Sequence, residues 1–155
     1  MSRAFVKETD TVEPLPERSV SPYPNYVSAA GLAAMDAELA RLTEGYARAQ
    51  VADDRDALAS IGRDLRYWQQ RRASAELFTP SPETSTVQFG STVTIRRDDG
   101  RRQGWRIVGE DEADPAKGSI SYVAPLARAL IGKAVGDVVS VGPSEAEIVA
   151  IDASA

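Results

Sequence analysis

The sequence predicts an α+β protein: an N-terminal antiparallel helical hairpin, followed by a small antiparallel sheet that carries one short helix. Two apolar seams with helical spacing predict the hairpin. Apolar alternation, broken by Asp-Gly and Gly-Pro turns, predicts the sheet. A Pro-Ser-Pro stretch between the two regions marks a domain boundary.

Residues 1–27 form a proline-rich leader that contains Pro14, Pro16, Pro22 and Pro24. Proline is unfavourable in helices and in central strands, so we expect this leader to be extended or disordered. The plain interpretation is a solvated tail. The alternative is an adaptor segment that recruits another protein.

Residues 28–78 have the pattern of an antiparallel coiled-coil hairpin. Ser28 is suited to cap the first helix. The two seams are formed by Leu32, Met35, Leu39, Leu42, Tyr46 and Ala49, and by Leu58, Ile61, Leu65 and Trp68. Arms of roughly 22–25 residues are about 35 Å long. Because each arm buries only one stripe, we expect the hairpin to project from the body of the protein.

A linker at 79–86 leads to the C-terminal domain at 87–155. We expect a first strand over 86–95, in which Gly90 makes a bulge or bend. Asp99-Gly100 predicts a hairpin turn, and the return strand is "GWRIVG". A short helix follows Pro125 and ends at Gly132. Runs at 137–141 and 146–152 complete the antiparallel sheet.

Composition excludes several kinds of chemistry. The chain has 155 residues, a net charge of −5, no His and no Cys. It therefore lacks a thiolate nucleophile and the commonest ligands of transition metals, and a metal would have to be held by carboxylates. The acidic balance disfavours direct binding to bare nucleic acid. We find neither a secretory signal nor an apolar run of about 20 residues, and we expect a cytoplasmic protein.

Several stretches resemble the C-terminal domain of the bacterial transcript cleavage factors GreA and GreB. They are "VQFGSTVTI", "WRIVGEDEAD" and "ISYVAPLARALIGKAVGDVV". The resemblance runs almost continuously from Val87 to Val141. Upstream, "YVSAAGLAAMDAELARL" and "IGRDLRYW" are similar to the two helices of that family's hairpin, so that about 125 residues are covered in all.

The resemblance implies a fold and a function. The C-terminal domain would have FKBP-like topology and grip the rim of the RNA polymerase secondary channel, while the coiled coil enters that channel. Acidic residues at the tip would help to hold Mg²⁺ in the polymerase active centre, and the polymerase itself would then cleave backtracked RNA. The resemblance implies no intrinsic enzyme activity and no cofactor beyond that shared Mg²⁺. It also implies only indirect contact with nascent RNA or DNA in the elongation complex.

The hairpin departs from the family pattern in length and at its tip. It is shorter by about twenty residues, which withdraws the tip by roughly 15 Å. An active-centre metal tolerates errors of about 1 Å, so we expect a modulator of elongation rather than a full cleavage factor. The tip carries Asp53, Asp54 and Asp56 in place of the family's acidic motif. Asp53 and Asp54 are candidate Mg²⁺ ligands; the alternative is that these residues cap the second helix.

Two further groups are candidate contact sites. The resemblance assigns polymerase binding to Val123, Ala124, Pro125 and Arg128, where Val-Ala replaces a more polar pair. Arg63, Arg66, Arg71 and Arg72 form a candidate basic patch toward RNA, or else a solvated face paired with nearby acids.

Two interpretations from other classes remain. The FKBP-like topology permits a peptide-binding or prolyl isomerase module, but such a site needs an aromatic pocket and the domain has few aromatic residues. The acidic stretch "GEDEAD" at 109–114 lacks the spacing of a calcium loop, and we expect an exposed acidic turn.

Overall fold

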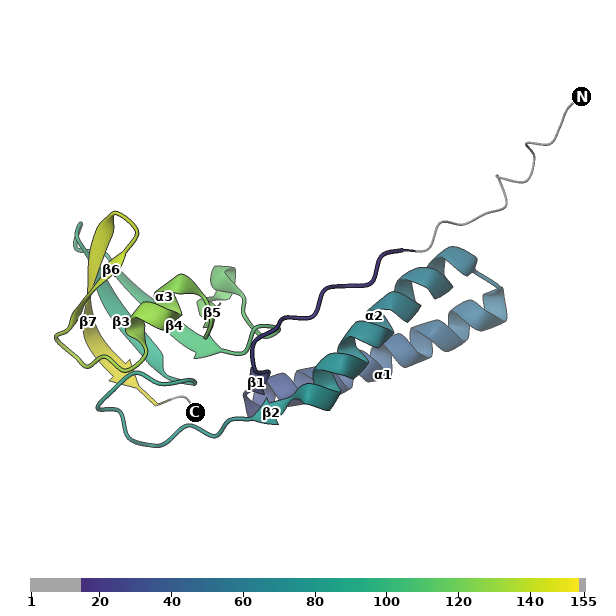
Figure 1. Ribbon diagram of the computed structural model, residues 1–155, viewed down its shortest axis with the longest axis horizontal. Helices are drawn as coiled ribbons and strands as arrows, with labels where there is room; N and C mark the ends of the chain where they lie inside the picture. The colour runs from purple at the N-terminus through teal and green to yellow at the C-terminus, as the bar shows by residue number, and fades with distance from the viewer. Residues whose placement is uncertain (1–14, 154–155) are drawn as a thin grey trace, which may run out of the picture.

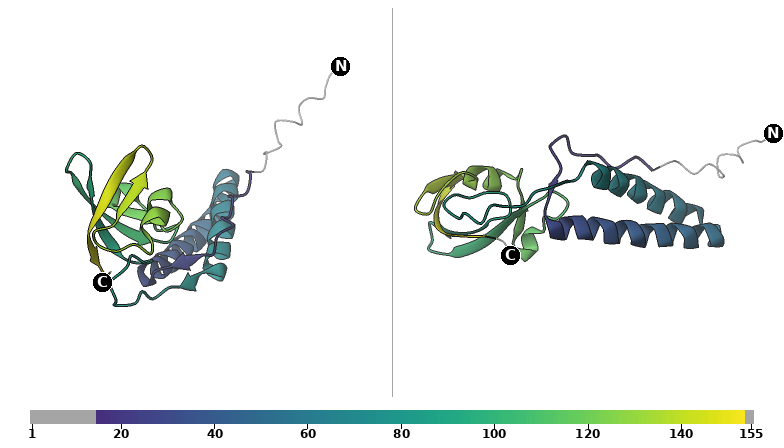
Figure 2. Two further views of the ribbon diagram at one scale, coloured as in Figure 1. Left: turned by 60° about the vertical axis from the view of Figure 1, so that its left-hand side comes forward. Right: turned by 90° about the horizontal axis from the view of Figure 1, so that it is seen from below.

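The structure is a computed structural model that describes residues 15–153. It has two lobes arranged along the long axis of the molecule (Figure 1). A two-helix hairpin projects from a body made of a curled sheet and one short helix (Figures 1 and 2). This arrangement confirms the predicted α+β class and the projecting hairpin.

The hairpin consists of α1 (Ala29–Ala52) and α2 (Arg55–Ser74). The Ser28 side chain accepts a hydrogen bond from the backbone N–H of Gly31 at 3.0 Å, so Ser28 is the N-cap as predicted. Met35, Leu42 and Ala49 are buried along one side of α1. Their spacing of seven residues follows the predicted seam and keeps α1 in register with α2.

Two short strands tie the base of the hairpin together. β1 (Tyr26–Val27) pairs in parallel with β2 (Glu76–Leu77). The N–H of Glu76 donates to the Asn25 carbonyl at 2.8 Å, and the N–H of Phe78 donates to the Val27 carbonyl at 2.9 Å. The last residues of the expected leader therefore belong to the folded structure, because their backbone groups complete this ladder.

The body contains a five-stranded sheet with the strand order β5-β4-β3-β7-β6. Its strands are β3 (Thr92–Arg97), β4 (Arg102–Val108), β5 (Ser119–Ser121), β6 (Val138–Val141) and β7 (Ser144–Asp152). The pairings are antiparallel except that β4 and β5 are parallel. The sheet is therefore mixed, because the chain between β4 and β5 crosses over through an acidic loop and the 3-10 helix η2 (Pro115–Lys117).

The first strand is shorter than expected. β3 begins at Thr92, and residues 87–89 are not part of the sheet. The N–H of Val87 donates to the Lys133 carbonyl, and the Val87 carbonyl accepts from the N–H of Gly132, each at 2.8 Å. The turn after the short helix therefore takes up the backbone groups of Val87, and Gly90, at φ +90°, bends the chain into β3.

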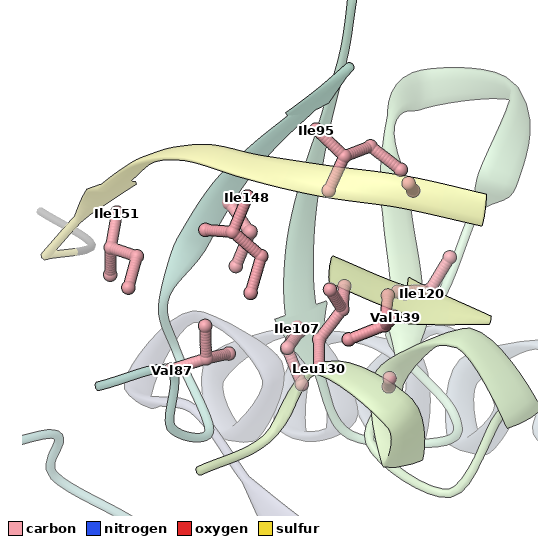
Figure 3. Packing of buried hydrophobic residues seen from close by; sticks show 11 residues of the cluster. Val87, Ile95, Ile107, Ile120, Leu130, Val139, Ile148 and Ile151 are labelled. Atoms are coloured by element: carbon pink, nitrogen blue, oxygen red, sulfur yellow. The ribbon is translucent and has the colours of Figure 1, made fainter. Parts of the chain in front are cut away.

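One apolar core fills the concave side of the sheet under α3 (Pro125–Leu130). Figure 3 shows Leu130 lying among Ile107, Ile120 and Val139. Full burial of an aliphatic side chain contributes about 1.5–3 kcal/mol. The short helix is thus held against the sheet by its apolar residues, and its Pro125 start faces outward.

Candidate functional site

The turn between α1 and α2 forms the tip of the hairpin. Asp53 has a left-handed backbone at φ 51° and its N–H donates to the carbonyls at the end of α1. The Asp54 carboxylate accepts from the backbone N–H of Ala57 at 3.1 Å and caps α2. Asp56 lies in the first turn of α2, where a negative charge complements the helix dipole. Each aspartate thus has a structural role in the turn.

The tip does not form a cation site by itself. Among residues 15–153, no group of three or more Asp and Glu side chains is placed to hold a metal ion. The Asp54 carboxylate is engaged in capping, and all three aspartates are exposed.

The candidate docking residues lie around the start of α3. Ala124 is the residue before the helix, Pro125 occupies its first turn, and Arg128 is exposed one turn later. Val123 is half-buried in the turn after β5, where its N–H donates to the Ser121 hydroxyl at 3.2 Å. These four residues therefore share one end of the body, as their sequence spacing predicts.

The four candidate basic residues of α2 do not form one exposed patch. Arg66 is bound by the Glu17 carboxylate at 2.6 Å, Arg72 by Asp36 at 2.7 Å, and Arg63 lies 3.7 Å from Asp64. Arg71 is only 1% exposed. The prediction of a basic patch that faces RNA is wrong for Arg71, because this side chain points into the joint between hairpin and body.

Arg71 is the centre of that joint. Its Nε donates to Asp111 at 2.6 Å and its Nη2 donates to the Asn25 side chain at 2.8 Å. A second carboxylate, that of Glu110, lies 3.8 Å away. The Asn25 amide in turn donates to the Arg71 carbonyl at 2.7 Å. A buried guanidinium is stable only with such partners, and the partners come from the leader and from the acidic loop of the body.

The acidic loop at 109–114 is part of the same joint and is not an exposed turn as expected. The Glu112 side chain accepts from the backbone N–H of Ser28 at 3.0 Å and from that of Gly109 at 3.1 Å, and it also bonds the Ser28 hydroxyl. A Cβ at Gly31 would lie 2.2 Å from Glu112. Glu112 therefore fits against the start of α1 because residue 31 is glycine.

Tyr67 completes the joint on the α2 side. Its hydroxyl donates to the Asp111 carboxylate. Burial, followed by this hydrogen bond and by the Asp111 charge, raises the pKa of Tyr67 to about 12. The phenol thus remains a donor to Asp111 throughout the physiological pH range.

Four aromatic rings pack between the base of the hairpin and the body. Tyr26, Phe78, Phe89 and Tyr122 are neighbours with ring centroids 5.1–5.8 Å apart. A cavity of about 190 Å³ beside them is lined by Phe78 and Phe89. This is smaller than the roughly 300–1,000 Å³ of typical ligand pockets. The rings contact one another and stabilise the joint, which disfavours a peptide-binding or prolyl isomerase site here.

Comparison with known sequences identifies the family. The model described as "Transcription elongation factor, GreA/GreB, C-term" matches residues 82–153. Transcription elongation factor GreB of Haemophilus ducreyi is 32% identical over 136 residues, which cover 76% of this chain and 84% of that protein. This chain belongs to the GreA/GreB family.

Other members of the family align over different lengths. GreB of Neisseria meningitidis serogroup B is 40% identical over 101 residues, covering 61% of this chain and 62% of its own length. The chain thus spans somewhat less than two thirds of that relative. A solved structure of "Prokaryotic transcription elongation factor GreA/GreB from Nitrosomonas europaea" is 22% identical, covers 83% of this chain and 98% of its own, and has a TM-score of 0.42.

The role of the joint residues could not be predicted from the sequence. Asn25, Arg71, Asp111 and Glu112 come from three separate segments, and no periodicity links them. One signal was present: Arg71 follows Trp68 by three residues, a helical spacing that continues the apolar seam of α2.

Within residues 15–153, neither long helix has an apolar stretch of the length that a membrane span requires.

Proposed function

We propose that this chain binds RNA polymerase at its secondary channel and modulates transcription elongation. The body docks through the start of α3, and the hairpin enters the channel. The observation that carries this proposal is the projecting hairpin, fixed at its base by the buried Arg71–Asp111 pair (2.6 Å). A hairpin that enters a channel must keep a fixed orientation relative to the body, and a joint of buried, hydrogen-bonded charges holds it in that orientation.

The reach of the hairpin supports a modulator over a full cleavage factor. α1 has 24 residues and α2 has 20, which correspond to lengths of about 36 Å and 30 Å. With roughly 15 Å less reach than the family pattern implies, the tip carboxylates would stop short of the catalytic Mg²⁺. The chain would then act by occupying the channel.

A second candidate is a genuine cleavage factor that uses the acidic tip. The exposure of Asp53 and Asp56 favours it, since these carboxylates could add ligands to a cation held by the polymerase. In this case the body would have to dock deeper than the family pattern implies.

A backtracked elongation complex separates these candidates. The variant is Asp53→Asn with Asp56→Asn, because Asn tolerates the left-handed backbone of residue 53 and Asp54 still caps α2, so the charge is removed while the turn is kept. The matched control is Glu44→Gln, an exposed carboxylate in the middle of α1. A modulator changes pausing or elongation rates equally with all three proteins and releases no cleaved RNA.

RNA cleavage that depends on Asp53 and Asp56 would instead establish the cleavage factor. If the chain neither binds polymerase nor changes transcription, the proposed function is wrong altogether.

A further inference from the structure

The segment 15–24, which we call the strap, lies against the rest of the protein. In Figures 1 and 2 it leaves β1 and runs alongside α2 toward the tip of the hairpin. Its residues have no regular secondary structure, so side chains hold it in place. Those side chains contact the hairpin at one end of the strap and the body at the other.

On the hairpin, the strap is held by charge. The Glu17 carboxylate accepts three hydrogen bonds from the guanidinium of Arg66, at 2.6–3.0 Å. The Arg18 guanidinium bonds Asp64 at 3.2 Å and lies over the Tyr67 ring, 3.8 Å from its centroid. Glu17 thus binds Arg66 in a bidentate geometry, which is the geometry in which Arg66 would bind a carboxylate of another protein.

On the body, the strap reaches the proposed docking surface. The Tyr23 ring lies under the guanidinium of Arg128, 4.9 Å from centroid to Cζ. The Tyr122 hydroxyl donates to the Pro24 carbonyl. Arg128 is one of the four residues assigned to polymerase contact, so Tyr23 already occupies one face of its guanidinium in the free protein.

The strap is held far more weakly than the residues that follow it. The Glu17 and Arg66 side chains remain 60% and 57% exposed, and such exposed pairs are weak and screened by salt. Asn25 and Val27, by contrast, are 4% and 1% exposed and take part in the joint and in β1. The strap can therefore detach while Asn25 and the residues after it stay folded, and Pro22 and Pro24 lie at the end of the strap that adjoins them.

We propose that the strap is a displaceable cover that occupies Arg66 and Arg128 in the free protein and leaves them when the body docks on RNA polymerase. This inference rests on the proposed function, because it regulates the same docking surface. Binding of polymerase must then compete with Glu17 and Tyr23. Because only molecules with a detached strap can bind, the apparent association constant is the intrinsic one multiplied by the fraction of molecules in which the strap is detached.

The test compares the unmodified chain, the double variant Glu17→Gln with Tyr23→Ala, and a control. The control combines Val20→Ala with Glu44→Gln; it removes one exposed strap side chain and one exposed carboxylate near Arg48. Phenylglyoxal modification of the folded proteins, read by peptide mass spectrometry, reports how accessible each arginine is. We expect Arg66 and Arg128 to react at least about threefold faster in the double variant than in the other two proteins. Equal modification rates in the three proteins would show that the strap does not cover Arg66 and Arg128.

The second measurement is the affinity of the same three proteins for RNA polymerase. We expect the double variant to bind about three- to tenfold more tightly than the unmodified chain, and the control to bind as tightly as the unmodified chain. Unchanged or weaker binding of the double variant would overturn the competition. If no protein binds polymerase, the proposed function fails, while the modification rates still decide whether the strap covers the two arginines.

Discussion

The body and the hairpin are held together by different kinds of contact. Eleven apolar residues form one buried cluster in the body. In α1 the apolar burial is confined to Met35, Leu42 and Ala49, and α2 contributes mostly half-buried side chains. What fixes the base of the hairpin is polar: Arg71, Asn25 and the carboxylates of the acidic loop.

This difference shows that the apolar core supplies most of the stability, whereas the polar joint sets the orientation of the hairpin. An apolar core tolerates the exchange of side chains of similar volume, and its contribution to the free energy of folding is proportional to the apolar area removed from water. A buried ion pair contributes little net free energy after desolvation, but it holds its groups in one geometry. The body can therefore fold on its own pattern, whereas the angle of the hairpin depends on a few specific atoms.

The largest expected effect comes from the core of the body. Ile148 lies on β7 and is fully buried. Replacing it with alanine removes three buried carbon atoms and leaves a cavity, so Ile148→Ala should lower the free energy of unfolding by about 4 kcal/mol. Urea titration followed by circular dichroism measures this. Val135→Ala, at a side chain that is 56% exposed, is the control and should change stability by less than about 0.5 kcal/mol. An equal loss in both variants would contradict this account of the core.

A smaller effect on stability, with a larger one on shape, is expected at the joint. Asp111→Ala leaves the buried Arg71 guanidinium with its hydrogen bond to the Asn25 side chain and with the Glu110 carboxylate 3.8 Å away. We expect a loss of about 3 kcal/mol, at the low end for a broken buried pair, because Glu110 compensates in part. Distances between spin labels on the hairpin and on the body should also broaden, since the direction of the hairpin is no longer fixed.

The matched control for the joint is Asp36→Ala. Asp36 also pairs with an arginine of α2, Arg72, at 2.7 Å, but these two side chains are 57% and 42% exposed. This variant should keep both the stability and the spin-label distances of the unmodified chain. A narrow distance distribution in Asp111→Ala would show that the aromatic rings and the β1–β2 ladder fix the hairpin without the ion pair.

Much of the fold could be predicted because the relevant signals are local. The seven-residue spacing of Met35, Leu42 and Ala49 marks the inner side of a helix, and Asp99-Gly100 marks a turn. Ser28 was placed correctly as a cap because capping depends on only a few neighbouring residues. The parallel pairing of β5 was missed, since period-two alternation does not specify the direction of a neighbouring strand.

The joint could not be predicted because its contacts are polar and distant in sequence. Arg71 and Asp111 are 40 residues apart, and Asn25 is 46 residues from Arg71. Charged residues are usually exposed, so composition favoured a basic surface on α2 and an exposed acidic loop. The same reasoning assigned the leader to solvent, whereas its described part lies on α2 and α3. Of the candidate site residues, the docking group at the start of α3 and the tip group each fell in one place, as their sequence proximity required.

The smallest effect on stability is expected at Tyr67, and its dependence on pH distinguishes the hydrogen bond of Tyr67 from its packing. The Tyr67 hydroxyl donates to Asp111, and burial together with that bond raises the pKa of Tyr67 to about 12, from an ordinary value of 10. Tyr67→Phe removes one hydrogen bond and should lower the free energy of unfolding by about 1 kcal/mol at pH 7.

Between pH 10 and 12 the unfolded chain releases the phenol proton while the folded chain retains it. The contribution of Tyr67 is therefore complete below pH 10 and is lost as the pH approaches 12. Urea titrations of both proteins across this range should give stability curves that converge at high pH. Curves that stay parallel would mean that Tyr67 stabilises the joint by packing alone, and that the polar contacts of α2 with the acidic loop depend on Arg71.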